Sequence, residues 1–411
     1  MNNDVEKILI YSGEGVDDES KNILSIIRQW AEKEILSDRM QYRAHYEEKF
    51  IEKRKILGLT IGLQRLMLSQ DNGGFGWESS IHAPALASIM FEIGRADASM
   101  GVLFAMQFSI FAALNMTTTT NETLYSTLTS LFGRNDLKTA AIILPGAGIL
   151  GKNTAIFSGR SINAVVETKS DGYVLNGADL RPFGNGAIAD IFCVVCADEK
   201  GTPSIAFIPA EERGISRKSI LLETGLNACK NTDVSFSNVS IPKAFLVSQQ
   251  GIVESLYIWL NLLLGGVSLG AAANFLEILD DWANTRVIKG GDRMKENPLC
   301  ASVVAEAVEE ITISRILLME LAHIIVRSEE WGKERNQKVY TLAQMIGSRI
   351  QKSALHATNR GMELMASAGY SKEWHAEKHW RDIKTIQSYL CGVGADIPVK
   401  MDIARYFFDS K

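Results

Sequence analysis

Two groups of side chains have types and spacings that could support metal or redox chemistry. Cys193 and Cys196 form a C-x-x-C pair, and His375, Glu377 and His379 form an H-x-E-x-H series. The cysteines lie in a strand-like run, where residues three apart face opposite sides, and the sequence has no second C-x-x-C to complete a zinc site. The H-x-E-x-H order displaces the carboxylate from its place in H-E-x-x-H zinc proteases. We therefore expect buried thiols and no metal site.

Two glycine-containing segments could bring backbone or cationic groups to an anion. Residues 145–148 (PGAG) follow an apolar run, and glycine there would let the main chain approach a cofactor closely. The segment is neither a Walker A motif nor a G-x-G-x-x-G, so its pattern alone indicates only a tight turn after a strand. Arg286, followed by Gly290 and Gly291 at the end of a long helical pattern, suits either a helix C-cap or a phosphate clamp.

The elements that must position these residues change character twice along the chain. Apolar residues recur at helical spacing up to about residue 130, interrupted by a glycine loop at 72–76 (NGGFG) and a break near Asp97. Short β-branched and aromatic runs follow, and residues 165–168 and 173–175 predict a hairpin. Long helical patterns return after Gly251. We expect an α+β chain with a helical domain at 1–138, a β domain at 139–248 and a helical bundle at 249–411.

Charge and cysteine content exclude several classes of protein. The 411 residues carry 43 Lys and Arg against 48 Asp and Glu, and the net charge of −5 argues against nonspecific nucleic-acid binding. Five cysteines without a paired spacing favour a reducing compartment over a disulfide-stapled secreted chain. The first 18 residues lack the cationic start and apolar run of a signal peptide, so we expect a cytoplasmic protein.

One apolar stretch, residues 256–275, is long enough to raise the question of a membrane span. It contains Asn261, Ser268 and three glycines, and charged helical sequence continues after it. Small residues allow neighbouring helices to approach closely. We therefore expect a helix buried in a soluble bundle, with no membrane span.

Taken in order, the short motifs of this chain resemble those of the acyl-CoA dehydrogenase family over nearly its whole length. Each motif is weak alone, but their order and spacing together are specific. The matching segments are 72–76 (NGGFG), 92–99 (EIGRADAS), 145–148 (PGAG), 233–236 (DVSF), 239–242 (VSIP), Gly270, Arg286 and 377–384 (EKHWRDIK) with Tyr389.

The resemblance implies a fold, a cofactor and a reaction. The fold would be an N-terminal helical domain, a middle β domain and a C-terminal four-helix bundle. FAD would lie between the β domain and the bundle, and the chain would assemble as a homodimer or a homotetramer. The substrate would be an acyl thioester of CoA or a carrier protein, and an electron-transfer flavoprotein could accept the electrons. A carboxylate would remove the α proton while the β hydrogen leaves as hydride.

The chain departs from this family at the base itself. The usual glutamate follows the tyrosine matched by Tyr389, and that position is Leu390. A shift of one residue places Cys391 there, and neither residue carries a carboxylate. A minority of the family has its base on the helix before Gly270, at the position of Leu260 here. Leucine has no lone pair to accept a proton, so the ordinary α,β-dehydrogenation should be impaired.

The resemblance also carries over a set of flavin-binding positions, several of them altered. Arg181 and Phe183 replace the tryptophan and threonine that contact the flavin ring. Arg181 could stabilise an anionic flavin, or it could simply pair with a surface acid. Arg286 matches the arginine at the FAD diphosphate, and Glu363, Ala366 and Ser367 match a stretch that holds the FAD of the neighbouring subunit. The full set is Ile143, Gly148, Ile149, Arg181, Phe183, Arg286, Asn297, Glu363, Ala366 and Ser367.

Two functions from different classes remain open. The chain could be an FAD-dependent oxidoreductase that works without the usual base, by reduction, rearrangement, elimination or hydroxylation. It could instead be a non-catalytic subunit that pairs with an active relative. Asp97 and Cys391 are the candidates for proton transfer, although a helix cap for Asp97 and a packed thiol for Cys391 are the simpler interpretations.

Overall fold

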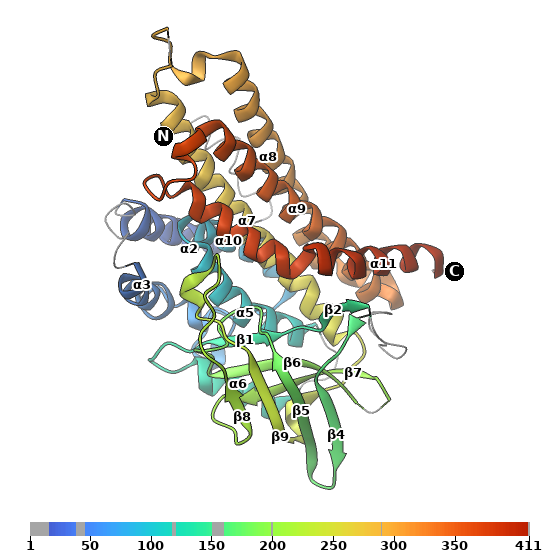
Figure 1. Ribbon diagram of the computed structural model, residues 1–411. Coiled ribbons are helices and arrows are strands. Elements are labelled where there is room, and N and C mark those ends of the chain that lie inside the picture. Colours follow the sequence, from blue (N-terminus) through green and yellow to red (C-terminus); the bar gives the residue numbers. More distant parts are fainter. Residues whose placement is uncertain are drawn as a thin grey trace.

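The computed structural model describes residues 16–37, 46–116, 121–149, 160–198, 200–288 and 290–409. Helices from both ends of the chain pack together, and the β domain lies against one end of them (Figure 1). The predicted order of helical, β and helical parts is confirmed.

The N-terminal part is helical, and one residue separates its two most buried helices. Asp97 is extended and accepts a hydrogen bond on Oδ1 from the N–H of Met100 at 3.1 Å, so it caps the second of these helices. The break predicted near Asp97 is therefore confirmed. The α-helices of this part are α2 (Asp18–Trp30), α3 (Tyr46–Lys55), α4 (Ala83–Ala96), α5 (Ala98–Asn115) and α6 (Glu122–Phe132).

The β domain contains an eight-stranded sheet in the order β10-β7-β6-β4-β5-β9-β8, with β1 parallel to β6. The predicted hairpin is confirmed, because Val166 of β4 lies opposite Leu175 of β5. The strands are β1 (Ala140–Ile143), β2 (Gly146–Ile149), β3 (Arg160–Ser161), β4 (Val165–Lys169), β5 (Gly172–Leu180), β6 (Ile191–Asp198), β7 (Pro203–Pro209), β8 (Ile215–Arg217), β9 (Val234–Pro242) and β10 (Leu246–Val247).

Two local expectations have different outcomes in this domain. Cys193 and Cys196 lie on opposite faces of β6, one in the core shared with the helices and the other in the core of the β domain, as predicted. The PGAG segment was expected to be a tight turn, but its glycines lie in β2, which pairs with β3. Backbone pairing with residues 160 and 161 holds this segment in an extended conformation. No sequence motif predicts that pairing.

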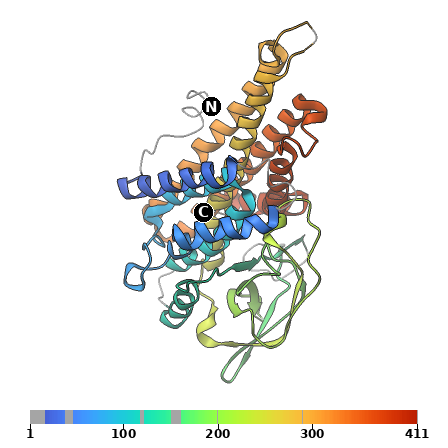
Figure 2. The same ribbon diagram turned by 90° about the vertical axis from the view of Figure 1, so that its left-hand side faces the viewer.

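The C-terminal part is built around α7 (Ile252–Thr285), which is almost fully buried. Glycines allow α4 to cross it closely: a Cβ on Gly270 would lie 2.0 Å from the carbonyl oxygen of Phe91. The most apolar window of α7 is long enough to span a membrane, but 89% of it is buried inside the protein. The other helices are α8 (Pro298–Val326), α9 (Arg335–Met365), α10 (Ala376–Cys391) and α11 (Val393–Asp409). Figure 2 shows the connection between α7 and α8 at the end of the bundle farthest from the β domain.

Candidate functional site

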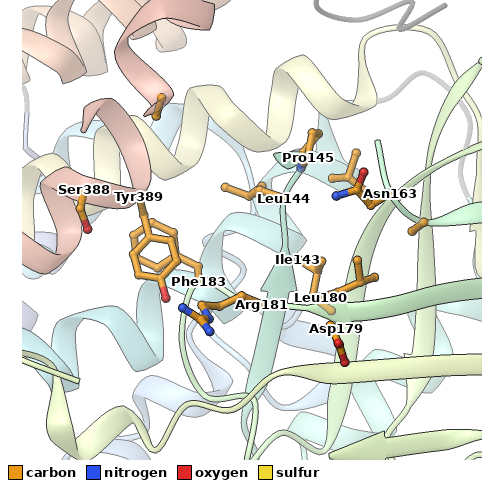
Figure 3. A pocket seen from close by; sticks show the side chains of 13 residues that line it. Ile143, Leu144, Pro145, Asn163, Asp179, Leu180, Arg181, Phe183, Ser388 and Tyr389 are labelled. Atoms are coloured by element: carbon orange, nitrogen blue, oxygen red, sulfur yellow. The ribbon is translucent and has the colours of Figure 1, made fainter. Parts of the chain in front are cut away.

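A cavity of about 240 Å³ lies where the β domain meets the ends of α10 and α11. Its walls are mostly apolar, with Arg181 and Tyr389 as polar groups on one side (Figure 3). Typical small-molecule pockets measure about 300–1,000 Å³, so this cavity suits one compact planar group rather than a whole dinucleotide. It is lined by Ile143, Leu144, Pro145, Asn163, Ala164, Asp179, Leu180, Arg181, Phe183, Val195, Ser388, Tyr389 and Ala395.

Arg181 lines the cavity and also pairs with an acid. Its Nε and Nη2 donate to the two carboxylate oxygens of Asp233 at 2.8 and 3.0 Å, a bidentate geometry that fixes the guanidinium. The hydrogen bond to Asp233 raises the pKa of Arg181 against the effect of burial. The interpretation of Arg181 as the partner of an acid is therefore confirmed, and its role toward a flavin stays a prediction.

Two aromatic rings form the wall opposite the β1 end. Phe183, which is buried, packs against Tyr389 with ring centroids 4.6 Å apart and planes tilted by 35°. The backbone N–H of Phe183 donates to the carbonyl of Ile142 at 2.8 Å, which ties the segment after β5 to β1. The position matched to a hydrogen-bonding threonine therefore offers only an apolar face.

The hydroxyl of Tyr389 belongs to a polar cluster at the edge of this wall, beside Arg181 (Figure 3). It donates to Glu223 Oε1 at 3.3 Å, a long distance for an O–H···O bond. The side-chain amide of Asn231 donates at 3.2 Å both to Glu223 Oε1 and to the Tyr389 oxygen. Sequence reasoning noted Tyr389 but missed Glu223 and Asn231, because neither stands in a motif with a chemical signature.

The environment favours the protonated forms of both acidic groups in this cluster. Burial raises the pKa of the Glu223 carboxyl, although hydrogen bonds from Asn231 and Tyr389 and the charge of Arg181 act in the opposite direction. Burial and the nearby Glu223 also raise the pKa of the Tyr389 hydroxyl. The cluster therefore holds protons more tightly than the same groups in water.

Helix α10 positions both halves of this cluster. It carries Tyr389 near its end, and two turns earlier Asp382 accepts the backbone N–H of Leu226 at 2.7 Å. Arg381 donates to the carbonyl of Thr224 at 2.5 Å. The loop that contains Glu223 is thus held by the helix that carries its partner, which gives the EKHWRDIK segment a structural role.

Asp97 belongs to a buried ion cluster on the same helix. Lys378 Nζ lies 2.9 Å from Asp97 Oδ2 and 2.6 Å from Asp382 Oδ2. Burial opposes the charge of Lys378, but the two carboxylates outweigh it and raise the pKa of the lysine. Asp97 does not line the cavity, and its two oxygens bind Lys378 and the N-terminus of α5. Its described contacts are those of a helix cap.

The other positions considered for a base are buried and do not line the cavity. Leu390 is 6% exposed and Leu260 is fully buried. The Cys391 thiol is buried, lies 3.9 Å from the carbonyl oxygen of Ser348, and has a pKa raised by burial. Asp179 is the one carboxylate on the described lining. Its side chain points away from the cavity (Figure 3) and pairs with Lys218 at 2.8 Å.

The residues matched to flavin contacts fall into two groups. Ile143, Arg181 and Phe183 line the cavity, and Gly148 and Ile149 lie in β2, just beyond Pro145 of the lining. The remaining five lie at the far end of the bundle, where the α7–α8 connection approaches the end of α9 (Figure 1): Arg286, Asn297, Glu363, Ala366 and Ser367.

The far group has an exposed cation and several fixed residues. The Arg286 side chain is exposed and has no ion pair or hydrogen bond within the described residues. Asn297 caps α8 by accepting the N–H of Leu299 at 3.0 Å, and Glu363 binds Arg360 at 2.8 Å. Ala366 directly follows α9 and has a φ of 51°. One chain therefore does not bring these residues to its own cavity.

A metal centre has no support in the described part of the chain. No group of three or more His, Cys, Asp and Glu side chains is placed there to bind an ion. His375 precedes α10 in a left-handed conformation, and His379 is buried one turn later.

Comparisons with known proteins agree with this architecture. The family model described as acyl-CoA dehydrogenase, C-terminal domain, matches residues 262–392. A 3-(aryl)acrylate reductase of Clostridium sporogenes is 22% identical over 89% of this chain and 93% of its own length. An acyl-CoA dehydrogenase of Bacillus subtilis is 24% identical over 80% of this chain and 83% of its own. The solved glutaryl-coenzyme A dehydrogenase complex superposes with a TM-score of 0.75 at 19% identity, over 96% of each chain.

This helical–β–helical architecture is the acyl-CoA dehydrogenase fold. The sequence matches span most of the chain and most of each relative. Residues 262–392 match the acyl-CoA dehydrogenase C-terminal domain model, and most of the chain is similar, at 22–24% identity, to the two relatives named above.

Proposed function

We propose that this protein is an FAD-dependent oxidoreductase that acts on a CH–CH bond of an acyl thioester by chemistry other than the family's usual proton abstraction. One observation carries the proposal. The family's fold keeps a cavity between the β domain and α10, but the positions matched to the base are Leu390 and Leu260. Both are buried, and neither borders that cavity.

The cavity fits the ring system of a flavin in size and in chemistry. Its volume and apolar walls suit a planar aromatic group, and Arg181 supplies a cation beside it. The ring system of the flavin would be held by Ile143, by Phe183 and by the backbone of Gly148 and Ile149. When bound, the flavin supplies hydride transfer.

The one cation on the described lining of the cavity, Arg181, is paired with Asp233, so we assign the diphosphate of FAD to residues outside this lining. Arg286, Asn297, Glu363, Ala366 and Ser367 would reach the FAD of a second copy, which supports a homodimer or a homotetramer. The five cysteines are free thiols buried in the protein, which supports a cytoplasmic location. An electron-transfer flavoprotein is the proposed electron partner.

The names of the relatives support a thioester or a related acid as the substrate. One relative is called a 3-(aryl)acrylate reductase and the other an acyl-CoA dehydrogenase. Both names describe addition or removal of hydrogen on a carboxylic acid or its thioester. We propose the same bond type here, with an acyl thioester of CoA or a carrier protein as substrate.

The test is the visible spectrum of the purified homomeric protein, followed by identification of the released flavin. The proposal predicts a yellow protein that releases FAD and whose spectrum changes on addition of acyl-CoA or enoyl-CoA compounds. A colourless protein that does not take up added FAD would contradict it.

A second candidate is a non-catalytic subunit, and the same two leucines favour it. Such a chain would pair with an active relative that supplies the carboxylate. It would be colourless alone and would acquire FAD only when mixed with that partner.

A further inference from the structure

We propose that Tyr389 and Glu223 form the proton donor of this site, so that the protein adds a proton to an unsaturated acyl group instead of removing one. The inference rests on the proposed function and specifies its direction. Tyr389 would be the catalytic acid that touches the substrate, and Glu223 would resupply its proton.

The contacts place the two groups in series between the cavity and the outside. The Tyr389 side chain lines the cavity, and its oxygen lies 3.3 Å from Glu223 Oε1. Glu223 is only partly buried, on the loop between β8 and the short helix Asn227–Cys229. In this proposal, a proton passes from solvent to Glu223, then to Tyr389, and then to an acyl group bound beside the flavin ring.

Asn231 fixes this geometry and acts only as a hydrogen-bond donor to Glu223 and Tyr389. Its amide donates to Glu223, to Tyr389 and to the carbonyl of Pro182 at 3.0 Å, while its own oxygen accepts the N–H of Gly186 at 3.2 Å. An amide held in this way does not accept the proton. The protonated Glu223 carboxyl can then donate to the Tyr389 oxygen, which frees the phenolic hydrogen to turn toward the cavity.

The surroundings of the pair keep both groups protonated, which is the state that a proton donor needs. Arg181 faces the pair from the end of β5 and is bound to Asp233, the residue just before β9. Cys229 faces the pair from the segment that also carries Asn231. Burial outweighs the Arg181 charge and raises the pKa of Glu223, and the pKa of Tyr389 is raised as well. Removal of an α proton needs an unprotonated acceptor, and this pair resists that state.

The proton and electron balance of the step closes for a reduction. The Tyr389 O–H bond breaks and a C–H bond forms at the α carbon of an enoyl thioester, with the hydride for the β carbon coming from a reduced flavin. The Glu223 carboxyl returns a proton to the Tyr389 oxygen, and solvent reprotonates Glu223. The product is the saturated thioester.

The first test measures protonation without any turnover. Infrared difference spectra of the protein against Glu223→Gln, recorded from pH 4 to pH 9, follow the carboxyl band that the substitution removes. We expect its midpoint above the ordinary glutamate value of about 4.3. A midpoint at or below that value would overturn the proposal, whatever the protein catalyses.

The second test measures the transfer itself. The dithionite-reduced, FAD-loaded protein is mixed anaerobically with cinnamoyl-CoA or crotonyl-CoA in H₂O and in D₂O. We expect Tyr389→Phe to slow reoxidation by roughly a hundredfold or more, the usual range for a general acid, with unchanged flavin content and unfolding temperature. Glu223→Gln should remove the fall in rate that loss of the Glu223 proton causes as the pH rises. Glu211→Gln, which changes an exposed carboxylate outside the cavity lining, should match the parent.

The outcomes separate this inference from the proposed function. A parent protein that binds FAD and desaturates butyryl-CoA, but does not reduce either enoyl-CoA, leaves the oxidoreductase standing and overturns the donor assignment. A Tyr389→Phe rate within about threefold of the parent does the same, because a general acid contributes far more than that. A parent that takes up no flavin refutes the proposed function first.

Discussion

Glu223 occupies a position where its negative charge is unfavourable. Its pKa is raised by burial, so the folded state binds its proton more tightly than the unfolded chain does. The stabilisation from this group is fully present below the unfolded pKa and is lost as the pH rises through the folded value. A side chain kept at such a position is typical of functional sites.

Replacing Glu223 with glutamine tests the direction in which this residue makes stability depend on pH. The amide keeps an oxygen that can accept from Asn231 and Tyr389 but does not ionise. We expect Glu223→Gln to gain stability relative to the parent as the pH rises from 4 to 8. Urea unfolding at the two pH values measures the difference, and a gap that shrinks with rising pH would refute the account.

Lys378 is a buried group whose charge is stabilised by its neighbours, in contrast to Glu223. It neutralises Asp97 and Asp382 and joins α5 to α10. We expect Lys378→Met to lower the free energy of unfolding by about 3–5 kcal/mol, because two buried carboxylates lose their partner. The control Lys372→Met removes an exposed lysine and should stay within about 0.5 kcal/mol. Equal effects in chemical denaturation would show that the cluster is not structural.

At the scale of elements, the crossing of α4 and α7 depends on glycine. We expect Gly270→Ala to destabilise the protein by about 1–3 kcal/mol, because the new methyl meets the Phe91 backbone at 2.0 Å and neither helix can move aside. Gly265 on the same helix is the matched control. The atom nearest to a Cβ there is the end of the Leu318 side chain, at 3.0 Å, which can rotate, and the Ile350 side chain lies at an ordinary contact distance of 3.6 Å.

The control variant Gly265→Ala also gains from the higher helix propensity of alanine. Alanine is about 1 kcal/mol better than glycine in a helix interior, which should offset the small adjustment at Gly265. Thermal unfolding of the two variants gives the comparison. Similar losses for both would mean that the close crossing of α4 and α7 does not limit stability.

Local patterns were sufficient to predict most elements. The break at Asp97, the hairpin of β4 and β5, and the long helices α7 to α9 follow from periodicity and turn residues within one segment. The strand β2 escaped prediction because glycine carries no strand signal. Glu223 escaped because its contact with Tyr389 joins residues 166 positions apart. The catalytic and flavin-binding assignments stay predictions, since they came from the family pattern and not from contacts.

At the scale of the whole molecule, the residues proposed to bind flavin form two separate groups, and our proposal assigns the far group to the FAD of a second copy. We expect Arg286→Ala to weaken FAD retention by roughly ten- to hundredfold, the effect of losing a charged hydrogen bond to a phosphate. Its exposed side chain has no partner within the described residues, so the unfolding temperature should not change. Lys295→Ala, an exposed cation of the same connection, is the control. Equal FAD affinity in the parent and both variants, measured by equilibrium dialysis, would show that Arg286 does not contact the FAD of a second copy.

The central claim is that this family fold retains flavin chemistry without the usual base, and one spectroscopic measurement tests it most directly. The purified homomer is loaded with FAD, reduced under anaerobic conditions and mixed with cinnamoyl-CoA while the flavin absorbance is recorded. The account predicts that the yellow colour returns as the enoyl thioester is saturated. Failure of the homomer to retain FAD, together with recovery of binding only after addition of a different, carboxylate-bearing relative, would contradict it.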